Sequence, residues 1–267
     1  MNKNFAFIIL VIFMFSACNT VPVTGRKQLS LISNDEIFPM SFQSYQSVLD
    51  SSKLATDQSQ VNMVKTVGKS IQKAVEEFMA EKGMSDELKG YKWEFNVIDE
   101  DIVNAWCMPG GKVVFYTGIL PICQNETGVA VVMGHEVAHA IANHGGERMS
   151  QGMVQQLGFS ALSVAIAEKP AATQQIYETA YGVTTNVGGM LPFSRLHESE
   201  ADKMGLIFMA MAGYDPREAP EFWKRMSEQS GGGAPPEFMS THPAHETRIQ
   251  QLNEAIPEAL KYYQQSN

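Results

Sequence analysis

The sequence has few of the features that mark several common classes of protein. It has 3 cysteines in 267 residues, too few for a disulfide-rich scaffold. Lysine and arginine number 20 against 29 acidic residues, so the formal net charge is −9 and no basic stripe for nucleic acid is present. No internal repeat is visible, and no apolar run reaches the roughly 18 residues of a membrane-spanning helix.

The two longest apolar runs are both shorter than a membrane span. Phe5–Phe15 follows the basic residue Lys3, a pattern typical of a secretory signal, which we assign to residues 1–17. Met153–Ala167 contains two glutamines and ends at a charged, proline-containing turn. We therefore expect the second run to be a buried helix or a lid rather than a membrane helix.

Cys18 directly follows the expected signal. Ser16-Ala17-Cys18 resembles a lipobox, so we expect Cys18 to be lipidated and residues 18–32 to be a tether. Because Asn19 is not aspartate, we expect an outer-membrane lipoprotein facing the periplasm of a Gram-negative bacterium. The alternative is an ordinary signal peptide with a chance cysteine.

The remaining residues, 33–267, have the composition of one domain with a sizeable core, since 44% of the chain is hydrophobic. Gln58–Ala80 has apolar residues at three- and four-residue spacing and predicts an amphipathic helix. Tyr91–Val97 alternates and predicts a strand, and short strands follow at Asn104–Met108 and Lys112–Thr117. We predict an α+β fold, mostly helical, with a small sheet.

The stretch after this sheet contains the chemistry. His135-Glu136-Val137-Ala138-His139 reads H-E-x-x-H within a run of helix formers. A step of four residues turns a helix by about 400°, so both imidazoles lie on one face, one turn apart. This is the geometry that a tetrahedral zinc ion requires of two nitrogen ligands. Glu136 lies about 100° further round the helix, where it can reach a zinc-bound water as general base.

His144, which follows this motif, is not expected to bind the metal. It lies nine residues from His135, about 900° along a continuous helix, and is predicted to point away from the metal, as a dipole-favoured or hydrogen-bonded histidine at the end of the helix. Gly145 and Gly146 are a plausible end of the helix.

A third ligand must come from elsewhere in the chain. The sequence does not contain the extended H-E-x-x-H-x-x-G-x-x-H motif, because Ala142 and Gly145 occupy the positions of its glycine and third histidine. A glutamate from a second helix is the remaining common solution. The best candidate is Glu198, and Asp202, four residues later on the same face, could support a ligand imidazole. Glu200 lies on a different face and is read as solvated.

These residues resemble peptidase family M48, a family of zinc metallopeptidases of the gluzincin type. The resemblance spans roughly Val21 to Ile256, and within the family the periplasmic lipoprotein branch fits best. The segments that carry it, besides the H-E-x-x-H motif and Glu198-x-Glu-Ala-Asp202, are Asn104-Ala105, Pro109-Gly110-Gly111, Thr117-Gly118, Thr241-His242-Pro243 and Arg248.

The resemblance implies a zincin-like core with a small sheet beside the H-E-x-x-H helix and one zinc ion per chain. It also implies that Asn104 and Ala105 lie on an edge strand that binds extended substrate. His242 would approach the active site, either to stabilise the oxyanion in catalysis or to occupy the fourth zinc position in a latent form. Arg248 would hold that segment or a substrate carbonyl. The alternatives are a covered β-hairpin and a histidine that only begins a helix.

We therefore expect a zinc endopeptidase that cleaves misfolded or unassembled envelope proteins in extended conformation. The alternative is a weakly catalytic, chaperone-like outer-membrane assembly factor with a latent zinc site. The expected partners are polypeptide substrates and, through the N-terminal lipid, a membrane. The sequence leaves open whether Cys107 and Cys123 form a disulfide, and glycine-rich stretches at 182–192 and 231–240 suggest mobile loops.

Overall fold

The computed structural model describes residues 18–185, 191–229, 236–242 and 246–266. Its sheet has three strands in the order β3 (Glu94–Ile98), β5 (Lys112–Tyr116) and β4 (Ala105–Met108). β3 is parallel to β5, and β4 is antiparallel to it. β4 is therefore an edge strand, as the family resemblance implies, and the turn at Pro109-Gly110-Gly111 joins it to β5.

Helices surround this sheet and make up most of the described chain. Two short 3-10 turns, η1 (Ser85–Leu88) and η2 (Thr117–Ile119), join elements near the sheet. The helices are α2 (Asn34–Ser51), α3 (Gln58–Glu81), α4 (Leu120–Cys123), α5 (Glu126–Ile141), α6 (His144–Ile166), α7 (Ala171–Thr185), α8 (Leu191–Met211), α9 (Glu218–Glu228), α10 (Glu237–Thr241) and α11 (Glu246–Ser266).

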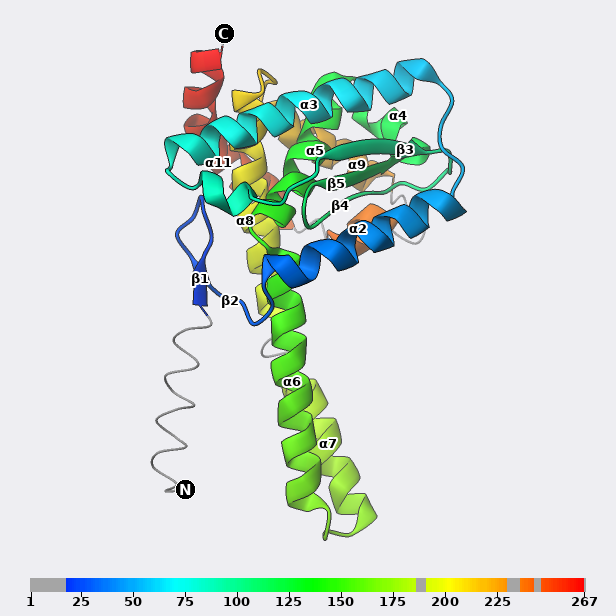
Figure 1. The fold of residues 1–267 in the computed structure, drawn as a ribbon, viewed down its shortest axis with the longest axis vertical. Helices are drawn as coiled ribbons and strands as arrows, with labels where there is room; N and C mark the ends of the chain where they lie inside the picture. The colour runs from blue at the N-terminus through cyan, green and yellow to red at the C-terminus, as the bar shows by residue number, and fades with distance from the viewer. Residues whose placement is uncertain (1–17, 186–190, 230–235, 243–245, 267) are drawn as a thin grey trace.

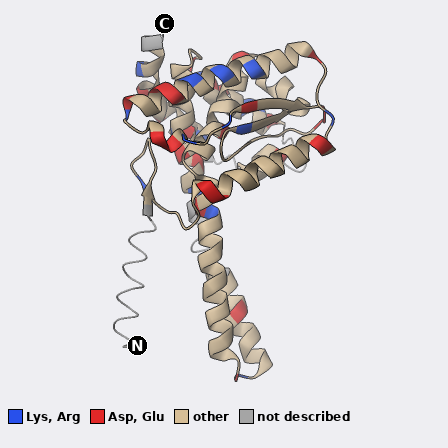
Figure 2. Ribbon diagram, in the orientation of Figure 1, with Lys and Arg blue, Asp and Glu red and all other residues tan. Residues whose placement is uncertain are grey.

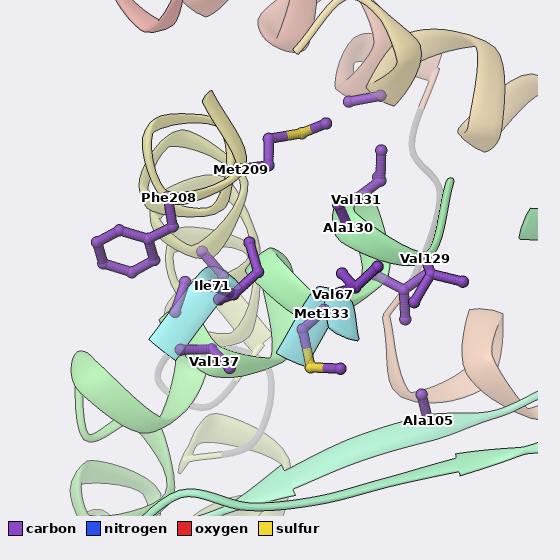
Figure 3. Close-up of a cluster of buried hydrophobic side chains, with 14 of the residues drawn as sticks. Val67, Ile71, Ala105, Val129, Ala130, Val131, Met133, Val137, Phe208 and Met209 are labelled. Carbon is purple, nitrogen blue, oxygen red and sulfur yellow. The ribbon is translucent and has the colours of Figure 1, made fainter. Parts of the chain in front are cut away.

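The sheet lies between two helical layers, with α2 on one side and α3 on the other (Figure 1). Tyr45 of α2 packs with Ile98 and Val114 on the α2 side of the sheet. The larger core lies on the opposite side, where apolar residues of α5 meet those of α3 and α8 (Figure 3). Ala105 of β4 also reaches this core, so the edge strand lies next to α5.

The helix α5 is buried from Gly128 to Ile141. It begins at Asn125, whose side chain accepts hydrogen bonds from the N–H groups of Thr127 and Gly128. It crosses α8 at Gly134 and Gly205, where a Cβ on Gly134 would lie 2.8 Å from the Gly205 oxygen. Only glycine allows this approach, which brings the backbone of α8 against the helix that contains His135.

Two features stand apart from this body. β1 (Cys18–Thr20) and β2 (Lys27–Leu29) form a small antiparallel hairpin. α6 and α7 form a helical hairpin that projects away from the rest of the fold (Figure 1).

The predicted fold class, α+β and mostly helical, is confirmed. Gln58–Ala80 is helical as predicted, and both short strands are present. Other boundaries differ: Gly145 and Gly146 lie inside α6, because the helix before them already ends at Ile141. Met153–Ala167 is helical as far as Ile166, but it is not a buried helix, since much of its apolar surface is exposed.

Two further expectations fall on segments that are only partly described. Of the expected loop at 231–240, residues 237–240 belong to α10, and 231–235 lie outside the described residues. In the other loop, 186–190 lie outside the described residues, and the residues on either side belong to α7 and α8. Cys107 and Cys123 are free thiols, which answers the question that the sequence left open.

Candidate metal centre

His135 and His139 lie one turn apart on α5, and both side chains are buried. Their Nε2 atoms are 3.1 Å apart, so both imidazoles present the same nitrogen to one point. The spacing of four residues on one helix therefore produces the convergence expected from the sequence.

Helix α8 places Glu198 against this pair. Its Oε2 lies 3.3 Å from Nε2 of His135, and its Oε1 lies 3.3 Å from Nε2 of His139. Burial alone would raise the pKa of this carboxyl, but hydrogen bonds with His135, His139 and His242 hold its pKa well below the usual range. Glu198 is therefore a buried carboxylate directed at the two imidazoles.

A fourth donor comes from His242, at the end of α10. Its Nδ1 lies 3.1 Å from Nε2 of His135 and 3.1 Å from both carboxylate oxygens of Glu198. His135, His139, Glu198 and His242 form the one group of potential metal ligands found among the described residues, with ligand atoms within 4.8 Å of one another.

The separations of these donors fit a zinc ion. Ligand atoms about 2.0 to 2.1 Å from zinc in a tetrahedron lie about 3.3 Å from one another. The measured distances between donors on His135, His139 and Glu198 are 3.1, 3.3 and 3.3 Å. Two imidazole nitrogens with one carboxylate oxygen are also a donor set that zinc binds in hydrolases.

Glu136 lies beside this cluster without belonging to it. Its Oε1 is buried and has no hydrogen-bond partner, and Nε2 of His242 lies 3.4 Å away. Burial raises the pKa of this carboxyl, while the nearby His242 and His135 oppose the rise. A buried carboxylate oxygen without a partner is placed to accept a proton from a reacting group.

Asp202 contacts His135 on the side of the ring opposite the metal ligands, and Arg248 supports Asp202. Oδ1 of Asp202 lies 2.9 Å from Nδ1 of His135, which leaves Nε2 to face the cluster. Arg248 donates two hydrogen bonds to Asp202, of 2.7 and 2.8 Å, and its guanidinium lies 3.4 Å from the ring centre of Trp223. Burial alone would lower the pKa of His135, but the hydrogen bonds with Asp202 and Glu198 raise it to about 9.

Arg248 also holds the segment that contains His242. It donates a hydrogen bond of 3.2 Å to the His242 carbonyl oxygen. The first of the two roles that the resemblance implied for Arg248, to hold this segment, therefore matches the described contacts.

His144, predicted to point away from the metal, lies directly behind His139. Its Nδ1 is 2.8 Å from Nδ1 of His139, and its Nε2 is 3.0 Å from Oε2 of Glu200. The prediction assumed one continuous helix, but α5 and α6 are separated at Asn143, which has a φ of 51°. This left-handed residue turns His144 back toward His139.

Glu200 is likewise not solvated. It is buried, and it accepts hydrogen bonds from Thr24 and from Nε of Arg26. Arg26 also forms a bidentate salt bridge with Glu147, in which Nη2 lies 2.7 Å from Oε2 and Nη1 lies 3.0 Å from Oε1. We call Arg26, His144, Glu147, His197 and Glu200 the support cluster, because each member is linked to another behind the metal ligands.

The support cluster also reaches α8. His197 lies 2.9 Å from Glu147 through its Nε2 and stacks on His144, with ring centres 4.2 Å apart. It is the neighbour of Glu198 in the sequence. The clearest signal for this cluster in the sequence is the high density of histidine and glutamate around both ligand segments. That density does not reveal which histidine contacts which glutamate.

The other expected site residues are placed on β4 and near the N-terminus. Asn104 is buried, and its side chain accepts a hydrogen bond from the N–H of Ala105 and donates one to Glu237 of α10. The N–H of Phe238, also in α10, donates to the carbonyl of Val103. In this conformation, α10 covers the start of the edge strand.

Cys18, the expected lipidation site, begins β1, but its side chain lies outside the described residues.

A buried pair of histidines one helical turn apart, a carboxylate from a second helix and an unpartnered glutamate beside them define a zincin-like metallopeptidase. The model of peptidase family M48 matches residues 66–256. The chain belongs to this family of metallopeptidases, whose members use zinc. The expected enzyme class and cofactor are thereby confirmed.

Several relatives have the name of a mitochondrial metalloendopeptidase, OMA1. The one from Schizosaccharomyces pombe is 32% identical over 93% of this chain and 69% of its own length. The human one is 30% identical over 97% of this chain, which spans only 50% of that protein. The beta-barrel assembly-enhancing protease of Escherichia coli is 29% identical over 59% of this chain and 33% of its own length.

The predicted location at a Gram-negative outer membrane is wrong by this comparison. The relatives from fission yeast, plant, budding yeast and human are named as mitochondrial proteins, not as proteins of a bacterial outer membrane. The prediction rested on Lys3, the apolar run Phe5–Phe15 and Cys18. A short apolar run after a basic residue is a general membrane-directed pattern, so it does not by itself define the compartment.

Proposed function

We propose that this protein is a zinc-dependent endopeptidase that hydrolyses peptide bonds in extended polypeptide segments. The observation that supports this proposal most is the set of donor separations around His135, His139 and Glu198, which match the edges of a zinc tetrahedron. In the proposal these three residues hold the metal.

Glu136 acts as general base and then as general acid. Zinc, when bound, polarises a peptide carbonyl and lowers the pKa of a bound water to about 7. Glu136 takes the proton of the attacking water and passes it to the leaving amine. Its buried, unpartnered Oε1 and its raised pKa suit a group that alternately accepts and releases a proton.

Asp202 and Arg248 orient the site. Asp202 fixes the tautomer of His135 through Nδ1, and Arg248 fixes Asp202. His139 receives comparable support from His144, which is held in turn by Glu200. The two ligand imidazoles are thus kept from turning away when substrate enters.

Substrate binds as an added strand along β4. The N–H of Ala105 points away from β5, and because strand residues alternate, the backbone groups of Cys107 share this open edge. Main-chain hydrogen bonds at such an edge hold an extended peptide largely independently of its sequence. Segments of misfolded or unassembled proteins, which lack their own pairing partners, suit this mode of binding.

The described conformation corresponds to a latent form of the enzyme. Phe238 and Glu237 of α10 contact the start of β4, and His242, at the end of α10, supplies a fourth donor to the metal group. One short segment therefore occupies both the entry to the edge strand and the position that water needs. In the active form this segment moves away from both.

A second function is a chaperone-like factor with little catalysis, which binds extended polypeptide at β4. The fourth donor from His242 favours this reading, and the relative from Escherichia coli is named for enhancing β-barrel assembly. The buried, unpartnered oxygen of Glu136 favours hydrolysis, because a purely structural zinc site has no use for a base.

The decisive experiment substitutes Glu136. Glu136→Gln keeps the size of the side chain and removes the base, so cleavage of casein should fall by about 10²- to 10⁴-fold while bound zinc stays at one per chain. Glu198→Ala should instead lose zinc. Glu81→Gln, exposed on α3, serves as the matched control and should change neither measurement. Cleavage at the wild-type rate by Glu136→Gln would overturn the proposed mechanism.

A further inference from the structure

The hairpin of α6 and α7 leaves an unusual amount of apolar surface uncovered. Leu157, Val164 and Ile176 have exposed fractions of 68%, 79% and 69%. Of the 11 large hydrophobic residues exposed in the described chain, 7 lie on this hairpin, which projects from the body (Figure 1). Scattered exposed apolar residues are ordinary, but this concentration on one element marks an interaction surface.

Four of the five exposed large hydrophobic residues of α6 form one line along the helix, and the fifth, Val154, lies about 60° to one side of it. At 100° per residue, Met149, Met153, Leu157 and Val164 fall within about 80° of arc, over a length of about 22 Å. We call these four residues the α6 stripe. The stripe is not the face that packs on α7, because Phe159, which contacts Tyr181 of α7, lies about 200° round the helix from Leu157.

The hairpin is also poor in charge. Between Met149 and Thr185 the only charged residues are Glu168 and Lys169, near the turn between the helices, and Glu178. Figure 2 shows the contrast with α3, where both basic and acidic residues are frequent. A surface that contacted only water or a charged partner would not be expected to have this composition.

The chain outside the described structure indicates what covers the stripe. The apolar run Phe5–Phe15 enters the described fold at Cys18 in β1. The hairpin of β1 and β2 lies beside the base of α6, where the N–H of Leu31 donates to Oγ of Ser150. The residue at which this apolar run joins the described chain therefore lies near the base of α6, so one apolar medium can receive both the run and the stripe.

We propose that the α6–α7 hairpin docks on a lipid bilayer, with the α6 stripe buried in the interfacial region and α6 lying along the membrane surface. None of the helices within the described ranges has the length and apolar character needed to cross a membrane. A helix with an apolar stripe and a polar remainder binds in the plane of the interface instead. This placement also leaves Glu168 and Lys169 near the headgroups rather than in the hydrocarbon.

The proposal is tested with a tryptophan that reports its own depth in the membrane. The full chain with Leu157→Trp is mixed with phosphatidylcholine vesicles whose acyl chains are plain or brominated, since bromine quenches tryptophan only inside the bilayer. The native tryptophans give the same background in every variant. The added emission should shift to the blue on plain vesicles and be mostly lost on brominated ones.

Two further variants make the result specific. Val164→Trp, on the same stripe, should behave as Leu157→Trp does, which guards against local misfolding at one position. Lys65→Trp, exposed on α3, should show no quenching, because it lies on the body. Vesicle flotation in parallel shows that each variant is bound.

Three outcomes would overturn the proposal. In the first, the protein floats with the vesicles, but the emission of the stripe variants is equal on plain and brominated vesicles. Only the N-terminal run would then lie in the membrane. Failure of the protein to float would exclude docking. A blue shift without lipid that grows with protein concentration, together with dimers in sedimentation, would assign the stripe to an interface between two copies of the chain.

Discussion

His242 has two possible effects on the proposed reaction, and its position favours one of them. Its Nδ1 is as close to His135 and Glu198 as the ligands are to one another, so in this conformation it competes with water for the metal. An oxyanion-stabilising role would instead place the ring beside the substrate, away from the donor group.

His242→Ala should therefore raise the rate of peptide cleavage severalfold and keep one zinc per chain. The physical reason is that removal of the fourth donor opens the position that water must occupy. Thr241→Ala is the control and should leave the rate unchanged, because the Thr241 hydroxyl donates to the carbonyl oxygens of Glu237 and Phe238 within α10. A rate that falls while zinc is retained would assign His242 to catalysis.

His135 leads to a second prediction at the scale of single residues. The pKa of the metal-free imidazole is raised to about 9, so this group is protonated at pH 7 and must become neutral to bind zinc. Zinc affinity should therefore rise by about tenfold per pH unit between pH 6 and 8 through this group. Below pH 6 cleavage should fall for the same reason.

Calorimetry in two buffers of different ionisation enthalpy measures the proton that zinc displaces. About one proton should be released per zinc ion at pH 7. Asp202→Asn removes the carboxylate that stabilises the protonated imidazole through Nδ1, so it should lower the number released. A zinc titration that releases no proton at pH 7 in the unmodified protein would contradict the assignment.

At the scale of elements, the support cluster links the β1–β2 hairpin to α6 and α8. Burial alone would raise the pKa values of Glu147 and Glu200, but hydrogen bonds with Arg26 and with His197 and His144 lower both to about 2. Both carboxylates are thus charged at neutral pH and depend on Arg26 for neutralisation. The loop between β1 and β2 therefore stabilises the helices that carry His139 and Glu198.

Arg26→Ala should leave two buried carboxylates without their shared cation and cost about 3 to 5 kcal/mol of unfolding free energy. Zinc affinity should also fall, because His144 and its contact with His139 lose their support. Urea unfolding and a zinc titration below the unfolding transition measure the two effects. Arg217→Ala, in an exposed pair with Asp215, should change stability by less than about 1 kcal/mol. Equal effects in both variants would refute the role of the cluster.

At the scale of the whole molecule, the metal would join segments that are far apart in the sequence. α5 contributes two donors, α8 and the residue after α10 contribute one each, and α8 also packs against α11. A ligand that binds only the folded state stabilises it by about 2.7 kcal/mol at a hundredfold excess over its Kd. The site is thus expected to contribute to global stability as well as to chemistry.

Chelation should lower the melting temperature by about 5 to 10 °C, and stoichiometric zinc should restore it. Differential scanning calorimetry measures this shift. Glu198→Ala should melt at one temperature with or without zinc, and calcium should not replace zinc, because it prefers oxygen ligands. A chelated protein that melts at the temperature of the zinc-loaded one would exclude a metal that bridges these elements.

The sequence by itself determined the features that depend on local geometry. His135 and His139 share a face because four residues are about one helical turn, and this holds wherever the helix lies. The alternating pattern of Tyr91–Val97 and the Pro109-Gly110-Gly111 turn likewise define strands from short-range preferences. Glu198 could be chosen from the sequence because zinc chemistry needs a third ligand and few segments offered one.

Only the tertiary structure decided which distant groups meet. The left-handed Asn143 turns His144 toward His139, and the contact between Gly134 and Gly205 brings α8 against α5. Arg26 lies more than 100 residues from its partners Glu147 and Glu200, so no local pattern could pair them. The exposure of the α6 stripe was also unpredictable, because an apolar helix looks the same in sequence whether the fold covers it or leaves it outside.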